Sequence, residues 1–380
     1  MTRARWSGLL PALLLACTSS SSSSARPAGK VTEAAPMADA RADHTATLLP
    51  DGRVLLAGGM VENGVFLASL EAYEPASGHF RALGNMQSPR VGHTATLLPD
   101  GKVLLAGGLA GTGGEGLKEG VTASAELFDP ATNAVAAAGP LTTHRAEHEA
   151  LLLPGGAPIL LGGNDGERVL SSVERYEPKS RRFVAAGALG APRMSLAAVV
   201  LDDGTVLVTG GSTGLGRDRA VLDSAEIYDP KTGRSTPVGR MSVPRHKHAA
   251  LRLGDGRVLI VGGSDARDWS GVHDTAEIYD PRTRRFSPAG KMALGRFKLP
   301  HAAAILPDGN ALLAGGNRAA EVYQAASGRF LPVEGALGEP KLYATATPLR
   351  DGRVLIAGGY GNGQAGRGPV SSAKAFLFSP

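Results

Sequence analysis

A short apolar segment that ends in a glycine pair recurs seven times along this chain of 380 residues. The first copy, Asp51 to Gly59, reads DGRVLLAGG, and the second, Asp100 to Gly108, reads DGKVLLAGG. A repeat with a period of about 50 residues predicts equivalent structural units that pack side by side. The later copies end at Gly162-Gly163, Gly210-Gly211, Gly262-Gly263, Gly315-Gly316 and Gly358-Gly359.

Each copy predicts the inner hairpin of one unit. Asp-Gly between two apolar runs is a strong hairpin signal, so residues 44–50 and 53–59 are expected to be paired strands. Both runs are apolar at nearly every position, which is typical of strands covered on both faces. A third strand resembling Ala225-Glu-Ile-Tyr-Asp-Pro230 follows, and a fourth lies seven residues beyond its aromatic. Four antiparallel strands joined by tight turns are typical of a propeller blade.

Length differences between the units fall on one connection. The interval from the glycine pair to the third-strand aromatic ranges from 8 to 21 residues, whereas the rest of the unit is nearly constant. In an up-and-down meander this connection emerges on the same edge as the link between blades. One face of the disc should therefore carry all variable loops, and loops on a rigid scaffold often carry function.

The last unit stops after its third strand, at Pro380. At the other end of the chain, Val31 to Met37 followed by Arg41 has the spacing of a fourth strand and the next blade's start. We therefore predict that residues 30–37 supply the outer strand of the last blade and close the ring. Closure removes an exposed sheet edge.

The N-terminus resembles an export signal. Arg3 and Arg5 precede the short apolar run GLLPALLLA, which is too short to span a membrane. The run stops at Cys17, the only cysteine, in a sequence similar to the lipobox of bacterial lipoproteins. We expect residues 1–16 to be a lipoprotein signal peptide and Cys17 to be lipidated; an ordinary secretory signal is the alternative.

Residues 17–29 include an unbroken serine tract and should be a flexible tether. The residue after the cysteine is threonine, not aspartate, which favours the outer over the inner membrane. A single cysteine also excludes a disulfide framework and a cysteine-based zinc site. The net charge of +5 comes from scattered basic residues, so no nucleic-acid partner is expected.

The glycine pair, the third-strand aromatic and the bulky residue seven positions later together resemble the kelch repeat. The resemblance covers residues 30–380 and implies an all-β fold, a seven-bladed kelch-type β-propeller whose last blade is closed by the N-terminal strand. One departure is the usual tryptophan of the fourth strand, which Phe, Val or Ser replaces here. Many proteins of this kind are secreted or lipid-anchored and have no known activity.

A basic residue opens the first strand of every unit, and by kelch analogy this strand lines the central channel. These residues could form a cationic ring for an anionic ligand. Alternatively, because they recur in all units, they form structural ion pairs with the third-strand glutamates, which we favour. They are Arg41, Arg90, Arg145, Arg193, Arg245, Lys298 and Lys341.

Histidines follow three residues after most of these basic positions. Metal binding needs three or four converging ligands, and no acidic or sulfur partner is patterned with them. We therefore expect hydrogen-bonded structural histidines and no metal or other cofactor. They are His44, His93, His148, His248 and His301.

Two loops break the symmetry of the repeat, at residues 217–219 and 264–274. They place an aromatic side chain beside charges on adjacent blades, as carbohydrate or peptide sites often do, although solvated loops are the alternative. The candidate ligand-binding residues are Arg217, Arg219, Asp265, Asp268, Trp269 and His273, together with Arg193 and Arg245.

No catalytic constellation stands out in the sequence. A galactose-oxidase-like copper site needs a cysteine cross-linked to a tyrosine, and Cys17 is assigned to lipidation; sialidase-type Asp boxes are also absent. We expect a monomeric, non-enzymatic binding or scaffold protein of the cell envelope, which touches the membrane only through its lipid. It would hold a glycan or an envelope protein on the variable face. The alternative is a carbohydrate-active enzyme such as a kelch-type sugar mutarotase.

Overall fold

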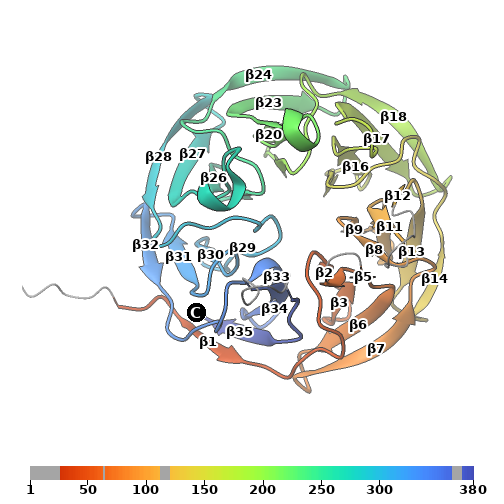
Figure 1. Cartoon of the computed structure of the whole chain (residues 1–380), viewed down its shortest axis with the longest axis horizontal. Helices are drawn as coiled ribbons and strands as arrows, with labels where there is room; N and C mark the ends of the chain where they lie inside the picture. Colours follow the sequence, from red (N-terminus) through yellow and green to blue (C-terminus); the bar gives the residue numbers. More distant parts are fainter. Residues whose placement is uncertain (1–25, 63–64, 112–119, 362–369) are drawn as a thin grey trace, which may run out of the picture.

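Seven four-stranded antiparallel sheets stand like blades around a central axis (Figure 1). The computed structural model describes residues 26–62, 65–111, 120–361 and 370–380. From the axis outward, blades 1 to 3 contain β2 (Thr45–Leu48), β3 (Val54–Ala57), β6 (Ser69–Glu74) and β7 (His79–Asn85); β9 (Thr94–Leu97), β10 (Val103–Ala106), β13 (Ala125–Asp129) and β14 (Ala134–Ala137); and β15 (Glu149–Leu152), β16 (Pro158–Leu161), β17 (Ser172–Glu177) and β18 (Arg182–Ala188).

The remaining blades repeat this order. Blades 4 to 6 contain β19 (Ala197–Val200), β20 (Val206–Thr209), β23 (Ser224–Asp229) and β24 (Arg234–Arg240); β25 (Ala249–Arg252), β26 (Val258–Val261), β27 (Thr275–Asp280) and β28 (Arg285–Lys291); and β29 (Ala303–Ile305), β30 (Ala311–Leu313), β31 (Glu321–Gln324) and β32 (Arg329–Pro332). Blade 7 contains β33 (Leu342–Pro348), β34 (Val354–Tyr360), β35 (Ala375–Ser379) and, outermost, β1 (Lys30–Glu33).

The N-terminal strand closes the ring as the sequence predicts. β1 pairs antiparallel with β35, and Val31 lies opposite Phe378. Val31 is buried in a cluster that includes Phe376 and Val322, so it packs between blades 7 and 6. The first and last strands of the propeller are therefore held in one sheet, and the edge of β35 is covered.

The hydrophobic core lies between neighbouring blades. All four residues of β3 are buried, as are those of β10, β16, β20 and β26. In one such cluster Leu55 and Ala72 of blade 1 pack with Val103 and Phe128 of blade 2. Strands that are covered on both faces explain why these runs are apolar at successive positions.

The glycine pair of each unit allows the next blade to approach closely. Gly58 has φ +60°, and a Cβ atom there would lie 2.6 Å from the carbonyl oxygen of Arg90 in the following blade. The neighbouring Gly59 donates its backbone N–H to the same oxygen at 2.9 Å. The repeated motif is thus a scaffold element, since a side chain at this position would push the blades apart.

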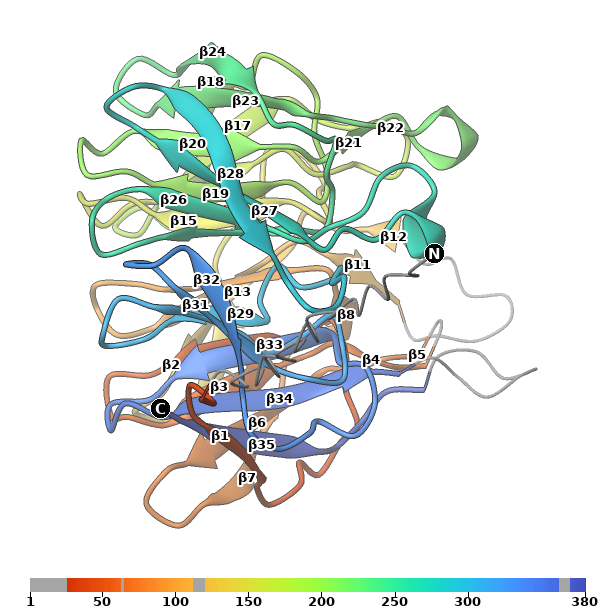
Figure 2. The same ribbon diagram turned by 90° about the vertical axis from the view of Figure 1, so that its left-hand side faces the viewer.

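The variable connections gather on one face of the disc, and the hairpin turns lie on the other (Figure 2). We call the first the loop face. Among the described residues, no helix is long and apolar enough to cross a membrane. The predicted signal peptide and Cys17 lie outside the described residues. The loop face carries β4 (Met60–Glu62), β5 (Val65–Phe66), β8 (Arg90–Val91), β11 (Leu109–Ala110), β12 (Gly120–Val121), β21 (Ser212–Thr213), η1 (Gly216–Asp218), β22 (Ala220–Val221) and η2 (Asp268–Ser270).

Candidate ligand site at the loop-face mouth of the channel

Buried arginine–glutamate pairs hold the linkers to the blades. In blade 3, Arg145 donates to the carboxylate of Glu174 at 2.6 Å and to the carbonyl oxygen of Gly162 at 2.7 Å. The same carboxylate accepts the backbone N–H groups of Thr142 and Thr143, which belong to the linker from blade 2. The corresponding pairs are Arg41–Glu71, Arg90–Glu126, Arg193–Glu226, Arg245–Glu277 and Arg296–Glu321.

This arrangement places two of the predicted ligand-binding residues inside the blades. Arg193 and Arg245 are almost completely buried, and their guanidinium groups contact a glutamate and backbone carbonyl oxygens of their own blade. The observed pairs agree with the structural interpretation of the basic residues. We therefore leave Arg193 and Arg245 out of the site proposed below.

The register predicted for blade 6 was wrong by two residues. Arg296, not Lys298, forms the buried pair with Glu321. Leu299, three residues after Arg296, stands where four of the other blades carry histidine, and its side chain approaches Gly262 as His148 approaches Gly107. The reason is an insertion: twelve residues separate Arg296 from the turn at Asp308, against ten in blade 5, so counting back from the turn gave Lys298 and His301.

Four of the predicted histidines join neighbouring blades. His148 of blade 3 shares a hydrogen bond of 2.9 Å with the hydroxyl of Thr94 in blade 2. Burial lowers the pKa of each histidine well below its usual value, so the rings are neutral. In the part of the chain that the structure describes, no three His, Cys, Asp or Glu side chains gather closely enough to hold a metal ion. The other pairs are His44–Thr345, His93–Thr45 and His248–Thr209.

A ring of left-handed residues forms the channel mouth on the loop face. In each blade the residue two positions after the buried Arg or Lys has φ between 49° and 60°. This conformation directs its backbone toward the adjacent blade; Lys247, for example, donates its N–H to the carbonyl oxygen of Ser195 at 3.0 Å. We call these seven residues the rim: Asp43, Gly92, Glu147, Ser195, Lys247, Lys298 and Tyr343.

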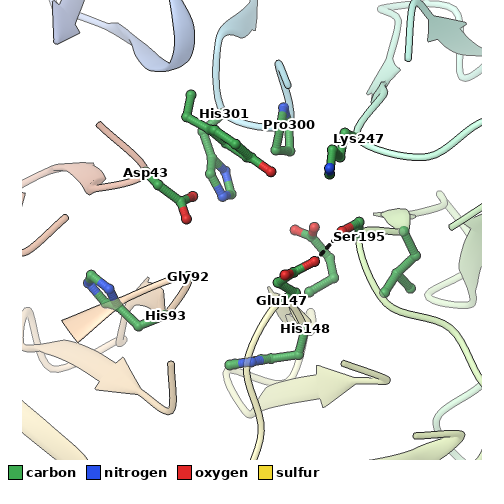
Figure 3. Close-up of a pocket in the computed structure, with 12 residues that line it drawn as sticks. Asp43, Gly92, His93, Glu147, His148, Ser195, Lys247, Pro300 and His301 are labelled. Atoms are coloured by element: carbon green, nitrogen blue, oxygen red, sulfur yellow. Dashed lines mark hydrogen bonds between the residues drawn. The ribbon is translucent and has the colours of Figure 1, made fainter. Parts of the chain in front are cut away.

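Rim side chains line a cavity with about 490 Å³ of empty space. Figure 3 shows Asp43, Glu147 and Lys247 directed into it, with His301 and Pro300 on its wall. A second cavity, with about 700 Å³ of empty space, continues along the channel and is lined mainly by alanines and threonines. The two cavities share Glu149, Pro300 and His301, so polar groups extend from the mouth into the interior.

Burial shifts the acid–base behaviour of this cavity. It raises the pKa of Asp43 to about 7, with a further contribution from the negative charge of Glu147. Burial alone raises the pKa of Glu149 to about 8. Lys298 shifts the other way: burial, and then the charge of Lys247, lower its pKa to about 8. Carboxyl and amine groups at this mouth therefore titrate near neutral pH.

An aromatic cluster lies beside the rim, where η2 of blade 5 reaches over blade 6. Trp269 is 49% exposed, and its ring meets Phe297 edge-on with centroids 4.9 Å apart. The Lys298 ammonium lies 4.4 Å from the centroid of the Trp269 ring and donates to the Tyr360 hydroxyl at 2.6 Å. Trp269 is thus fixed on one side and open to solvent on the other.

Asp268 connects this cluster to the rim. Its Oδ1 atom lies 3.6 Å from the Lys247 ammonium and 3.6 Å from Nε2 of His246. Oδ1 is buried and has no hydrogen-bond partner among the described residues. An unsatisfied carboxylate oxygen between two nitrogen groups is a position that a polar ligand can complete.

The structure brings together only part of the candidate set predicted from the sequence. Asp268 and Trp269 lie at the mouth. Burial acts to raise the pKa of Asp268, but nearby positive charges, first Lys247 and last Arg219, lower it. Asp265 instead accepts the backbone N–H and the guanidinium of Arg267 and so builds its own turn. His273 contacts the carbonyl oxygen of Pro244. Arg217 belongs to η1, but its side chain lies outside the described part.

Several residues of the site were missed by sequence reasoning. A signal for the rim does exist: the position two residues after each first-strand Arg or Lys changes in type while the residues around it repeat. That position was passed over because its neighbours carried the recognisable pattern. The missed residues are Asp43, Glu147, Ser195, Lys247, Tyr343 and Tyr360, together with Lys298 in its rim role.

Seven four-stranded blades around a channel define the protein as a β-propeller. The sequence profile of the Kelch motif matches residues 193–242 and 245–293, which form blades 4 and 5. The chain is therefore a kelch-repeat protein, as the sequence predicts. No curated protein matches its sequence.

The solved structures include a similar fold in a fungal enzyme, described as a "novel fungal alcohol oxidase with catalytic diversity among the AA5 family, in complex with copper". The two chains are 17% identical, with a TM-score of 0.71 over 93% of this chain and 76% of the oxidase chain. At this identity the similarity shows the fold alone.

Proposed function

We propose that this protein is a binding protein that holds a carbohydrate at the loop-face mouth of its channel. The observation that carries the proposal is Trp269, half exposed and fixed in orientation by Phe297 and Lys298. A saccharide ring presents an apolar face of C–H groups that stacks on such a platform. Trp269 offers such a face to solvent in a fixed orientation.

Polar groups next to the platform supply the hydrogen bonds that a saccharide requires. Asp268 offers a carboxylate oxygen that lacks a partner, and Lys247 offers an ammonium group 3.6 Å from it. The rim cavity beside them is a concave space that can enclose part of a ligand. An apolar wall with a few convergent polar groups is the usual composition of a small-molecule site.

Replacing Trp269 tests this proposal. Trp269→Ala should weaken the binding of any glycan identified on an array by about 30-fold, as for other central aromatic contacts worth about 2 kcal/mol. Titration calorimetry of the purified protein measures the change. Leu152→Ala is a matched control, since Leu152 is similarly exposed but lies on blade 3, in the first strand next to the hairpin turn. Unchanged affinity in Trp269→Ala would remove the platform from the site, and binding to no glycan at all would reject the function.

A second candidate function is a carbohydrate-active enzyme such as a mutarotase. The observation that favours it is the presence of Asp43, Glu149 and Lys298 at one mouth, with pKa values of about 7, 8 and 8. Groups that exchange protons near neutral pH suit acid–base chemistry on a sugar ring. The anomer exchange rate of a bound sugar, measured by NMR, separates the two functions: a binding protein leaves that rate unchanged.

We further propose that the propeller is exported and tethered to a membrane through a lipid on Cys17. The support is the sequence: a basic start, a short apolar run that ends at Cys17, and the serine tract after it. The Cys17→Ser variant should leave the membrane fraction and appear in the soluble envelope fraction. Membrane retention of Cys17→Ser would argue against the anchor and for attachment through the propeller itself.

A further inference from the structure

We propose that the ligand of this site is a zwitterionic saccharide, with its amine held near Asp43 and Glu147 and its carboxylate held near Lys247 and Lys298. This inference rests on the proposed carbohydrate binding and specifies its ligand class. It starts from the rim, where the fold repeats one backbone geometry seven times. Only the side chains differ, so they are what a single ligand can distinguish.

Opposite charges occupy opposite sides of the rim. The acidic residues belong to blade 1 (Asp43) and blade 3 (Glu147), and the basic ones to blade 5 (Lys247) and blade 6 (Lys298). Blades 1 and 3 lie across the channel from blades 5 and 6 (Figure 1). Figure 3 shows the Asp43 carboxylate and the Lys247 ammonium facing each other across the cavity. The rim residues therefore give the mouth a negative half, at Asp43 and Glu147, and a positive half, at Lys247 and Lys298.

These charges do not neutralise one another. Between described residues, no salt bridge joins Asp43 or Glu147 to a basic side chain. Glu147 accepts from the Ser195 hydroxyl, and Lys298 donates to the Tyr360 hydroxyl, so both contact neutral groups. Lys247 has one carboxylate partner, Asp268 of the neighbouring loop, at a loose ion-pair distance of 3.6 Å.

Inside the blades, by contrast, buried charges are closely paired. There, each of the six buried arginines has a glutamate oxygen at hydrogen-bond distance, within 3.2 Å, whereas Lys247 and Asp268 at the mouth lie 3.6 Å apart. Charges that are partly desolvated and held apart are unfavourable unless a countercharge reaches them. Burial raises the pKa of Asp43 and lowers the pKa of Lys298, so the surroundings disfavour the charged form of each group.

A ligand with one kind of charge cannot satisfy both halves of the mouth. An anionic sugar gains at Lys247 but is repelled by Asp43 and Glu147, and a cationic sugar meets the reverse. A neutral sugar supplies no countercharge to either half. A saccharide with an amine and a carboxylate supplies both countercharges at once, which is the electrostatic complementarity that sets specificity.

Four sugars that share a pyranose ring test the inference on the full protein at low salt. They are N-acetylglucosamine (neutral), glucosamine (cationic), glucuronic acid (anionic) and muramic acid with its free amine (zwitterionic). Muramic acid should bind at least ~10-fold more tightly than each of the others, and added salt should reduce this advantage because ions screen charges at an open mouth. N-acetylmuramic acid, which keeps the carboxylate but not the amine, should lose the advantage.

Two variants assign the two halves of the mouth. Asp43→Asn should bring the affinity for muramic acid down toward that for N-acetylmuramic acid, and Lys247→Met should bring it down toward that for glucosamine. Asp202→Asn is the control: this exposed carboxylate is paired with Arg252 near a hairpin turn and should have no effect. The comparison of muramic with N-acetylmuramic acid needs no variant, so it stands even if a variant fails to fold.

The outcomes separate this inference from the function on which it rests. Trp269-dependent binding of the neutral sugar, with no preference for muramic acid, would overturn the zwitterion assignment and leave carbohydrate binding intact. Equal or tighter binding of a singly charged sugar would overturn it as well. If none of these sugars nor any arrayed glycan binds, both proposals fail together.

Discussion

A chain that lacks residues 30–37 should melt at least ~10 °C below the intact protein, or fail to show a single cooperative transition. The reason is that β1 is the outer strand of blade 7, paired with β35 over four residues. Val31 also fills the contact between blades 6 and 7. Without β1, the last blade has three strands and an open edge, and the ring is no longer held shut. Thermal unfolding followed by circular dichroism measures the difference.

Two smaller changes show whether the effect comes from the strand or from the length of the chain. Val31→Asp should lower the melting temperature strongly because Val31 is 6% exposed, whereas Thr32→Asp on the exposed side of the same strand should have little effect. Removing only residues 18–25 should also leave stability unchanged, as expected for a tether. An unaltered melting temperature after deletion of 30–37 would show that β1 does not hold the ring.

The fold was predictable because the same unit occurs seven times, so each strand and turn can be recognised in several copies. Register could be checked against six other units, so the hairpins, the blades and even the donated strand followed from spacing. The same reliance on spacing produced the error at Arg296 and Lys298. An insertion between the buried arginine and the first strand, here between Arg296 and Ala303, is invisible when positions are counted from the turn that follows the strand.

The site was harder to predict because its residues meet only in three dimensions. Trp269 lies in the connection between β26 and β27, and its position over Lys298 depends on the path of η2 across blade 6. No local pattern encodes that path. Asp265 and His273 looked equivalent to Trp269 in the sequence, yet Asp265 accepts hydrogen bonds from Arg267 of its own loop, and His273 contacts the carbonyl oxygen of Pro244 in the linker before blade 5. Charged loop residues often stabilise the loop itself.

Breaking one buried arginine–glutamate pair should destabilise the protein by about 3–5 kcal/mol, because the partner is left as an uncompensated buried charge. Arg145→Met and Glu174→Gln in blade 3 are the variants of choice, since both side chains are fully enclosed. In each variant the remaining charged residue has no countercharge. Glu174→Gln also weakens the hydrogen bonds from the linker N–H groups of Thr142 and Thr143. Chemical denaturation gives the change in the free energy of unfolding.

The double variant Arg145→Met/Glu174→Gln distinguishes charge compensation from simple loss of packing. It should cost clearly less than the sum of the single changes, because no charge then remains buried alone. The matched control lies on the same strand: Arg175 and Glu177 form an exposed pair, and Glu177→Gln should cost less than about 1 kcal/mol. If Arg145→Met cost no more than Glu177→Gln, the recurring arginines would not be needed for stability. The alternative, a cationic ring that binds an anionic ligand, would then be favoured, and Arg193 and Arg245 would again be candidate ligand-binding residues.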